Sequence, residues 1–298
     1  MIQQKNVLKL TKSLGDFHYF PKPTNFNLTN TNMNLLSMGF ILYTQFGVLS
    51  SAFFGVIGKS SCEEESIKLD IKRICGLFFP AYLPQYFNDY PYYQLYVFIQ
   101  SLNAAMLISS GILVIAFTCG VVELLTCHIA NLKRLLSECF DVENEEERKN
   151  RLKLCVKYHV HIIKMAEKMN STLGNATFAN ATFTGIILAI VFFQFTREPS
   201  VKTFIHGFGW LLALFVISYC GQRLINESEG ISNCMYFTDW YTADVEAQKY
   251  LILIIARSNH YLYLDAKGFG HVCLETFTNA LKAAYSFLTL LLNSADDY

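Results

Sequence analysis

The sequence predicts an all-α fold: a polytopic membrane helical bundle with about five spanning helices plus cytosolic helical extensions. Hydrophobic residues make up 52% of the 298-residue chain and charged residues only 16%, whereas soluble domains are about 25% charged. The charge is missing from several long continuous runs rather than reduced evenly. Because a helix needs about 20 apolar residues to cross the hydrocarbon core, each such run is a candidate membrane span.

Residues 1–34 form a polar, basic segment that we expect to lie in the cytosol. The segment holds four lysines against the single acid Asp16, and its two prolines are followed by Asn and Thr residues typical of a loop. It lacks the apolar core of a cleavable signal peptide, so insertion is expected to depend on the first spanning helix. Residues 35–298 are expected to form a single transmembrane helical domain.

Five stretches are long and apolar enough to be spanning helices. Their expected bounds are about 35–58, 93–118, 174–196, 203–222 and 273–293. We expect residues 59–92 to be a loop, because they are first acidic and then rich in Pro and aromatic residues. Cys62 and Cys75 share this loop. A disulfide on the outer side of the membrane and two free thiols are equally compatible with the sequence.

Two amphipathic helices follow the second span and are too charged to cross the bilayer. One apolar stripe runs from Val121 to Cys139 and another from Leu152 to Ala166, each at a spacing of three to four residues. We interpret both helices as extensions of spanning helices that project into the cytosol, separated by the acidic run DVENEEE. Residues 223–244 are expected to be a polar loop. The helix 245–256 that follows is apolar but too short to span.

The distribution of Lys and Arg sets the expected orientation. Residues 1–34, 119–173 and 222–272 hold four, nine and four of them, whereas the opposite loops 59–92 and 197–202 hold four and two. The positive-inside rule places the N-terminus in the cytosol and the C-terminus outside. Five Asn-X-Ser/Thr sequons fall on the cytosolic side or at its membrane edge, where they are not glycosylated: Asn27, Asn170, Asn175, Asn180 and Asn226.

Composition and spacing argue against several classes of site. The formal net charge is zero and the chain has no basic arm or stripe, so nucleic acid is not an expected partner. Cys155, His159 and His161 could in principle bind a metal, but no second ligand pair lies elsewhere in the sequence. We therefore expect no metal, no cofactor and no catalytic residue. Three residues of the fourth span could line a pocket, although packing between helices is the commoner role: His206, Trp210 and Tyr219.

The last span differs from the others because polar residues run along one of its faces. At helical spacing, a single stripe contains Glu275, Asn279, Lys282, Ser286, Thr289 and Asn293. Such a stripe can be a packing seam between bundled helices, or the wall of a pore that several copies surround. The periodicity leaves both interpretations open and slightly favours the commoner seam.

Three stretches of the chain are similar to a known family. The C-terminal block reads Leu274-Glu275-x-Phe277, then Leu281-Lys282-x-Ala284-Tyr285-Ser286-Phe287, and closes at Leu290. Upstream lies PxYLPQYF followed by YPYYQLYVFIQ, and a short helix precedes Arg257-Ser258. With these motifs the chain resembles the insect odorant receptors, ligand-gated cation channels with seven spanning helices. The family normally has two further helices before the first span found here, so the chain is expected to correspond to helices three to seven.

The resemblance implies a heterotetrameric channel built with the family's co-receptor, surrounded by lipid in the plasma membrane of sensory neurons. By motif position, the pore and gate residues are Leu290, Asn293, Ser294, Thr289 and Ser286. A volatile odorant is expected to bind among the outer halves of the first four spans, in an apolar pocket with few polar groups. The candidate lining residues are Gln45, Ser50, Phe53, Phe54, Met106, Phe183 and Tyr219.

The sequence therefore predicts an odorant receptor subunit of a ligand-gated cation channel, without enzymatic activity. One alternative is a gustatory receptor of the same fold, although the ending AAYSFLTLL is more similar to the odorant branch. Another alternative is a non-functional, truncated receptor. A membrane enzyme or transporter would need a catalytic or ion-binding cluster, or broken helices in paired repeats, and the sequence shows neither. A G-protein-coupled receptor would start outside and finish inside.

Overall fold

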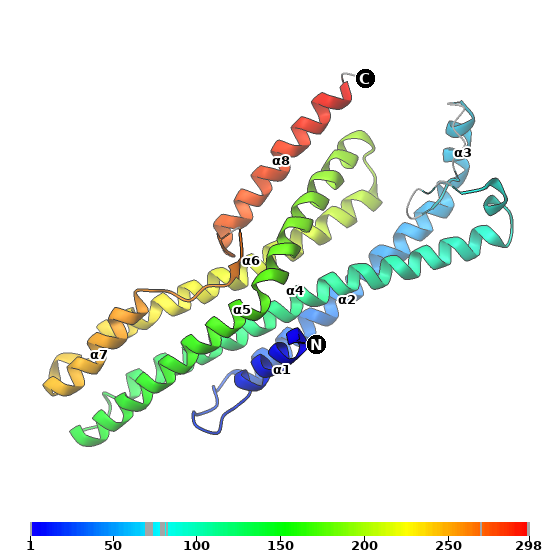
Figure 1. The fold of residues 1–298 in the computed structure, drawn as a ribbon. Coiled ribbons are helices and arrows are strands. Elements are labelled where there is room, and N and C mark those ends of the chain that lie inside the picture. Colours follow the sequence, from blue (N-terminus) through cyan, green and yellow to red (C-terminus); the bar gives the residue numbers. More distant parts are fainter. Residues whose placement is uncertain (1, 69–73, 78–80, 82, 269, 297–298) are drawn as a thin grey trace. The chain divides into compact units, whose positions relative to one another are not determined.

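The computed structural model describes residues 2–68, 74–77, 81, 83–268 and 270–296. These residues form an almost entirely helical chain, which confirms the predicted all-α fold class (Figure 1). The helices are α1 (Ile2–Leu14), α2 (Phe26–Ile57), α3 (Lys59–Lys68), η1 (Gln85–Asn88), α4 (Tyr92–Glu138), α5 (Glu145–Arg197), α6 (Val201–Tyr236), η2 (Trp240–Thr242), α7 (Val245–Ser258) and α8 (Leu274–Asp296). Strands β1 (Asp265–Ala266) and β2 (Gly270–His271) pair in antiparallel fashion.

Four of the described helices, α2, α4, α5 and α6, are long and apolar enough to cross a membrane. They contain the first four predicted spans, so the chain is a multi-pass membrane protein. Helix α8 covers the fifth predicted span but falls outside this group of described helices. Its polar stripe lowers its hydropathy, and its passage through the membrane stays a prediction.

The predicted cytosolic extensions are continuous with the spanning helices. Helices α4 and α5 contain 47 and 53 residues. At about 1.5 Å per residue they are about 70 and 80 Å long, more than twice the roughly 30 Å of a hydrocarbon core. The apolar stripe of α4 is buried as its spacing predicts, with Val121 3% exposed and Leu125, Ile129, Leu132 and Leu136 fully buried.

Three segments expected as loops are more helical than predicted. Residues 2–14 form α1, which buries Leu10 and Leu14 one turn apart. The loop after the first span contains α3 and η1, and an ion pair at i, i+4 between Lys59 and Glu63 stabilises α3. Helix α6 runs on to Tyr236 through the expected polar loop, because its buried residues continue at helical spacing: Leu224, Ser228, Ile231 and Met235.

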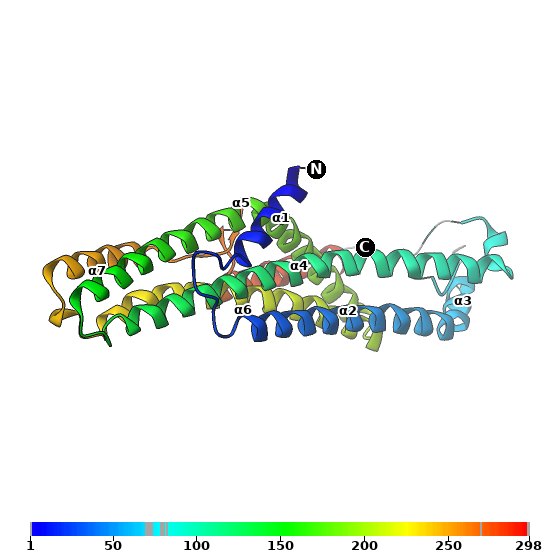
Figure 2. The same ribbon diagram turned by 90° about the horizontal axis from the view of Figure 1, so that it is seen from below.

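The chain divides into two compact units. The first unit comprises residues 1–35, 115–185 and 214–283. One bundle forms in this unit from the C-terminal halves of α4 and α6, the N-terminal half of α5, and the whole of α7 (Figure 1 and Figure 2). Inside this bundle, His128 Nδ1 lies 2.8 Å from the Tyr158 hydroxyl and His128 Nε2 lies 3.0 Å from the Leu14 carbonyl oxygen. These contacts attach α1 to α4 and α5.

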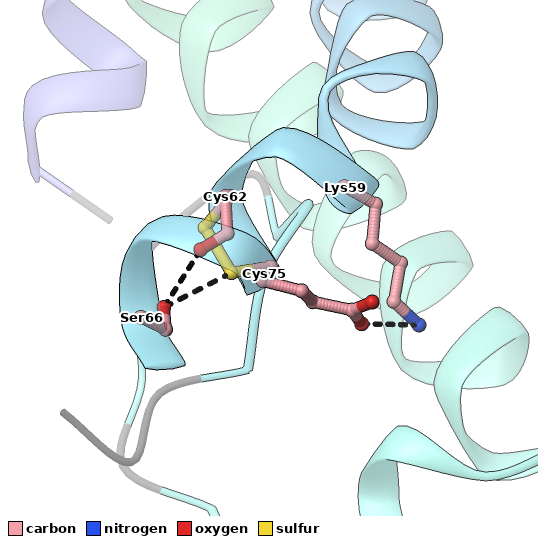
Figure 3. The surroundings of a disulfide bond; sticks show 5 residues. Lys59, Cys62, Ser66 and Cys75 are labelled. Atoms are coloured by element: carbon pink, nitrogen blue, oxygen red, sulfur yellow. Dashed lines mark hydrogen bonds and ion pairs between the residues drawn. A yellow bond between two sulfur atoms is a disulfide. The ribbon is translucent and has the colours of Figure 1, made fainter. Parts of the chain in front are cut away.

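The second unit comprises residues 36–114, 186–213 and 284–298. At one end of it, Cys62 on α3 forms a disulfide with Cys75 (Figure 3). The sequence left open whether these two cysteines are bonded or free, and in the structure they are bonded. The Ser66 hydroxyl donates to the Cys62 carbonyl oxygen over 2.8 Å. The Lys59 ammonium group lies 3.7 Å from the centre of the Tyr93 ring, which joins α3 to the start of α4.

Candidate ligand cavity and pore helix

A small cavity in the second unit lies among α2, α4 and α6. Its volume is about 40 Å³, several times what one water molecule needs and well below that of a drug-sized ligand site. It is lined by Phe40, Tyr43, Thr44, Gly47, Val48, Ile108, Ile112, Ile205, His206, Gly209 and Trp210. The lining is mostly apolar, with a few polar groups, which is the composition of a small-molecule site.

Helix packing fixes the polar groups of this cavity. The Tyr43 hydroxyl of α2 donates to the Ile205 carbonyl oxygen of α6 over 2.6 Å. Trp210 Nε1 donates to His206 Nε2 over 3.2 Å, one turn apart on α6. Gly209 lets the Tyr43 ring approach the α6 backbone, because a Cβ at this position would lie 2.6 Å from Tyr43 Cε1. A Cβ at Gly47 would meet no described atom within 4 Å, so this glycine leaves open space.

The candidate pocket residues predicted from the sequence lie elsewhere on the helices. Gln45 donates to the Ser109 hydroxyl over 2.9 Å, and Ser50 donates to the Gly47 carbonyl oxygen over 3.0 Å. The other five are exposed, with exposed fractions from 41% to 64%: Phe53, Phe54, Met106, Phe183 and Tyr219. Within the described chain the cavity lining includes none of the seven, and their role stays a prediction.

Sequence reasoning considered His206 and Trp210 and preferred packing, whereas the structure shows that both pack and line the cavity. It missed Tyr43, Thr44 and Gly209. A usable signal existed in the spacing, because Phe40, Tyr43, Thr44, Gly47 and Val48 recur every three to four residues along α2.

Helix α8 presents its polar stripe outward. Glu275, Asn279, Lys282, Ser286 and Asn293 are exposed and Thr289 is half-buried. Ala284 and Leu288 are buried, being 4% and 9% exposed. Two residues correspond to about 200° of rotation around a helix, so Ala284 lies nearly opposite Lys282. Of the other predicted gate residues, Leu290 is 59% exposed and Ser294 is exposed.

The Cys and His residues of the predicted cytosolic extensions lie in or beside a packed core. Cys155 lies 3.9 Å from Cys139, and the ring of His161 lies 5.1 Å from that of Phe20. Outside the predicted spans, burial and then the Arg257 charge lower the pKa of His159 to about 4. The described residues contain no cluster of three or more potential metal ligands.

Residues 22–285 match the family model described as 7tm Odorant receptor. The chain belongs to this odorant receptor family. It is 27% identical over 209 residues to putative odorant receptor 85d of Drosophila melanogaster, a match that covers 68% of this chain and 50% of that protein. It is 28% identical over 231 residues to odorant receptor 85b of the same organism, covering 74% of this chain and 58% of the relative.

The chain thus spans about half to three-fifths of the length of the curated relatives it matches. Among solved structures it is similar to the insect olfactory receptor OR5 from Machilis hrabei in complex with eugenol, with a TM-score of 0.70 and 13% identity. That alignment covers 98% of this chain and 76% of the other. The odorant receptor family is a family of receptors rather than enzymes, as the sequence predicted.

Proposed function

We propose that this chain is the odorant-binding subunit of a ligand-gated cation channel that assembles with the family's co-receptor. The observation that carries the channel part of the proposal is the outward polar stripe of α8. A helix surrounded by lipid would be penalised for Glu275, Lys282 and Asn293 on its surface. These residues suit a helix that faces water or other subunits, as the wall of a pore does. The exposed stripe therefore supports the wall of a pore over a packing seam between helices as the role of α8.

The odorant part of the proposal rests on family membership and on the cavity among α2, α4 and α6. An apolar lining favours an uncharged, mostly apolar ligand, and the Tyr43 and His206 side chains supply a few polar contacts. At about 40 Å³, this cavity must widen to admit an odorant. In this proposal, the ligand stabilises the wider arrangement of the three helices and so shifts the channel toward opening.

The proposed orientation has the N-terminus in the cytosol and the C-terminus outside. The distribution of Lys and Arg supports it, and so does the Cys62–Cys75 disulfide, which lies in a segment assigned to the outer side. Disulfides persist in oxidising compartments and are rare in the cytosol. The plasma membrane of sensory neurons is the location that fits this function.

The test is to express the chain with the co-receptor and record cation currents during application of an odorant panel. Odorant-evoked current supports the proposal. No current from this chain, but current from the chain extended by the first two membrane helices of a family member, indicates that the function needs the longer protein. Absence of current from both would overturn the odorant-gated channel.

The pore assignment has its own test. Because Asn293 is exposed on the polar stripe, we expect Asn293→Ala to change the relative permeability to Na⁺, K⁺ and Ca²⁺. Leu292→Ala is the matched control, since Leu292 is half-buried and lies about 100° away around the helix. Equal permeability ratios in the wild type and Asn293→Ala, in a conducting complex, would contradict this role for α8.

A further inference from the structure

A second and larger cavity lies within the first unit, among α5, α6, the β1–β2 hairpin and α8. Its volume is about 210 Å³, more than ten times what one water molecule needs. Apolar side chains form most of its wall, including Ile217, Val272 and Phe277. None of the described residues that line it is Asp, Glu, Lys or Arg. The cavity therefore suits an uncharged, mainly apolar molecule.

The hairpin is held in place as a wall of this cavity. Asn170 of α5 donates to the Tyr263 carbonyl oxygen over 2.9 Å and accepts from the Asp265 amide over 3.0 Å. The Val272 amide donates to the Leu264 carbonyl oxygen over 2.9 Å. These bonds hold the segment that carries Ala266 and Val272, two lining residues, beside α5.

Thr177 of α5 lines the cavity and is 3% exposed, yet its hydroxyl has no hydrogen-bond partner in the described part of the chain. Thr182, five residues further along α5, shows the usual solution, because its hydroxyl donates to the Phe178 carbonyl oxygen over 3.0 Å. A buried hydroxyl without a partner is costly, so such a group in a cavity wall is a place where a bound molecule gains affinity. A rotation about χ1 exchanges the Thr177 methyl and hydroxyl groups at the wall.

We propose that this cavity is a second small-molecule site, which binds an uncharged molecule with an apolar body and one hydroxyl or carbonyl group that hydrogen-bonds to Thr177. Two more buried hydroxyl residues, Thr184 of α5 and Ser218 of α6, also line the cavity and are each 2% exposed. The site is separate from the cavity among α2, α4 and α6, and the two share no lining residue.

Water and lipid chains fit this cavity less well. A buried water needs two to four polar partners, and a mostly apolar wall of this size offers too few to fill the volume with ordered water. An acyl chain would fill apolar space but would leave the Thr177 hydroxyl unpaired. A molecule of the proposed class satisfies both the apolar wall and the hydroxyl.

The test uses a photoreactive alkanol, an eight-carbon alcohol that carries a diazirine, on the purified full chain in detergent. Labelled peptides are identified by mass spectrometry, with octanol as competitor. We expect octanol-sensitive label on residues 177–184, 214–218 or 276–283. Thr177→Val keeps the shape and removes the hydroxyl, and should weaken octanol competition about three- to tenfold. Thr177→Ser keeps the hydroxyl and should retain the octanol competition of the wild type.

Two further variants separate this site from the other cavity. Ala280→Leu fills the second cavity and should abolish its label, whereas Gly47→Leu fills the cavity among α2, α4 and α6 and should leave that label unchanged. The unfolding midpoint of each variant checks that it folds. Label confined to residues 40–48 and 205–210, or labelling that Thr177→Val and Ala280→Leu leave unchanged, would overturn the proposal. Neither result depends on channel current.

Discussion

Gly209→Ala tests the close packing that shapes the cavity among α2, α4 and α6. The added Cβ would lie 2.6 Å from Tyr43 Cε1 and 3.5 Å from Tyr43 Cδ1 and Cζ. Carbon atoms pack at about 3.5–4.0 Å, so the ring has to move by about 1 Å. That movement is opposed by the hydrogen bond from the Tyr43 hydroxyl to Ile205, one turn earlier on α6.

Overpacking of this kind costs about 1–3 kcal/mol, and a lost hydrogen bond adds about 1 kcal/mol. We therefore expect Gly209→Ala to lower the free energy of unfolding by about 2–4 kcal/mol. In cells that express the co-receptor, the odorant concentration for half-maximal response should rise, since the displaced Tyr43 ring changes the cavity wall.

The first measurement is the unfolding midpoint of the purified chain in detergent, and the second is the odorant dose–response curve. Gly39→Ala is the matched control on α2, because a Cβ there meets no described atom within 4 Å and should cost nothing. Tyr43→Leu in the Gly209→Ala background removes the clash and should recover part of the loss, as a double-mutant cycle would show. Additive effects, or wild-type stability of Gly209→Ala, would refute this reasoning.

Three further predictions address the rest of the chain. Arg223→Ala should lower the free energy of unfolding in detergent by roughly 2 kcal/mol, because it leaves the buried Glu123 carboxylate without its ion-pair partner at 2.7 Å. Arg223 is 47% exposed, which limits the loss, and adding Glu123→Gln should recover the lost stability. The pKa of His159 is about 4 in the folded state, below its unfolded value, so the unfolded state binds more protons between about pH 6.5 and 4. The stability of the fold should therefore decrease as the pH drops through that window, and it should decrease less in His159→Gln. In Cys75→Ser the freed Cys62 should react with a membrane-impermeant maleimide on intact cells; labelling that requires permeabilised cells would reverse the proposed orientation.

The long helices of the fold were predictable because their physical causes are local. Charge-free runs set the first four spans, and the stripe that includes Leu125 and Leu132 indicated that α4 continues beyond the predicted span. The missed helices have other causes. Helix α3 depends on a local ion pair and on a disulfide whose formation the sequence left undecided. The continuation of α6 depends on buried contacts of residues such as Ile231, although its surface is polar enough to be taken for a loop.

The cavity residues were hard to predict because they come together from distant parts of the chain. Tyr43 and Ile205 are 162 residues apart in sequence, and their contact depends on which faces α2 and α6 present to each other. Phe53 and Met106 were predicted as pocket residues from their apolar residue type. Residue type alone does not distinguish a pocket wall from a surface in lipid. Here the glycines carried more information, since close approach at Gly209 and open space at Gly47 shape the cavity.

Helix α8 connects the two proposals, because its two sides have different surroundings. Phe277 and Ala280 line the second cavity, whereas Lys282 and Ser286 belong to the exposed stripe. At about 100° per residue, Ala280 and Lys282 lie roughly 160° apart around the helix. Asn279 of the stripe also lines the cavity. A molecule in the cavity would therefore contact mainly the side of α8 away from Lys282 and reach the stripe at Asn279, while ions in the proposed pore would pass Lys282 and Ser286. It can alter gating only if it binds the open and closed arrangements of α8 with different affinity. A photolabelled site with no effect on odorant-evoked current would thus mean equal affinity for both arrangements, and the site would still exist.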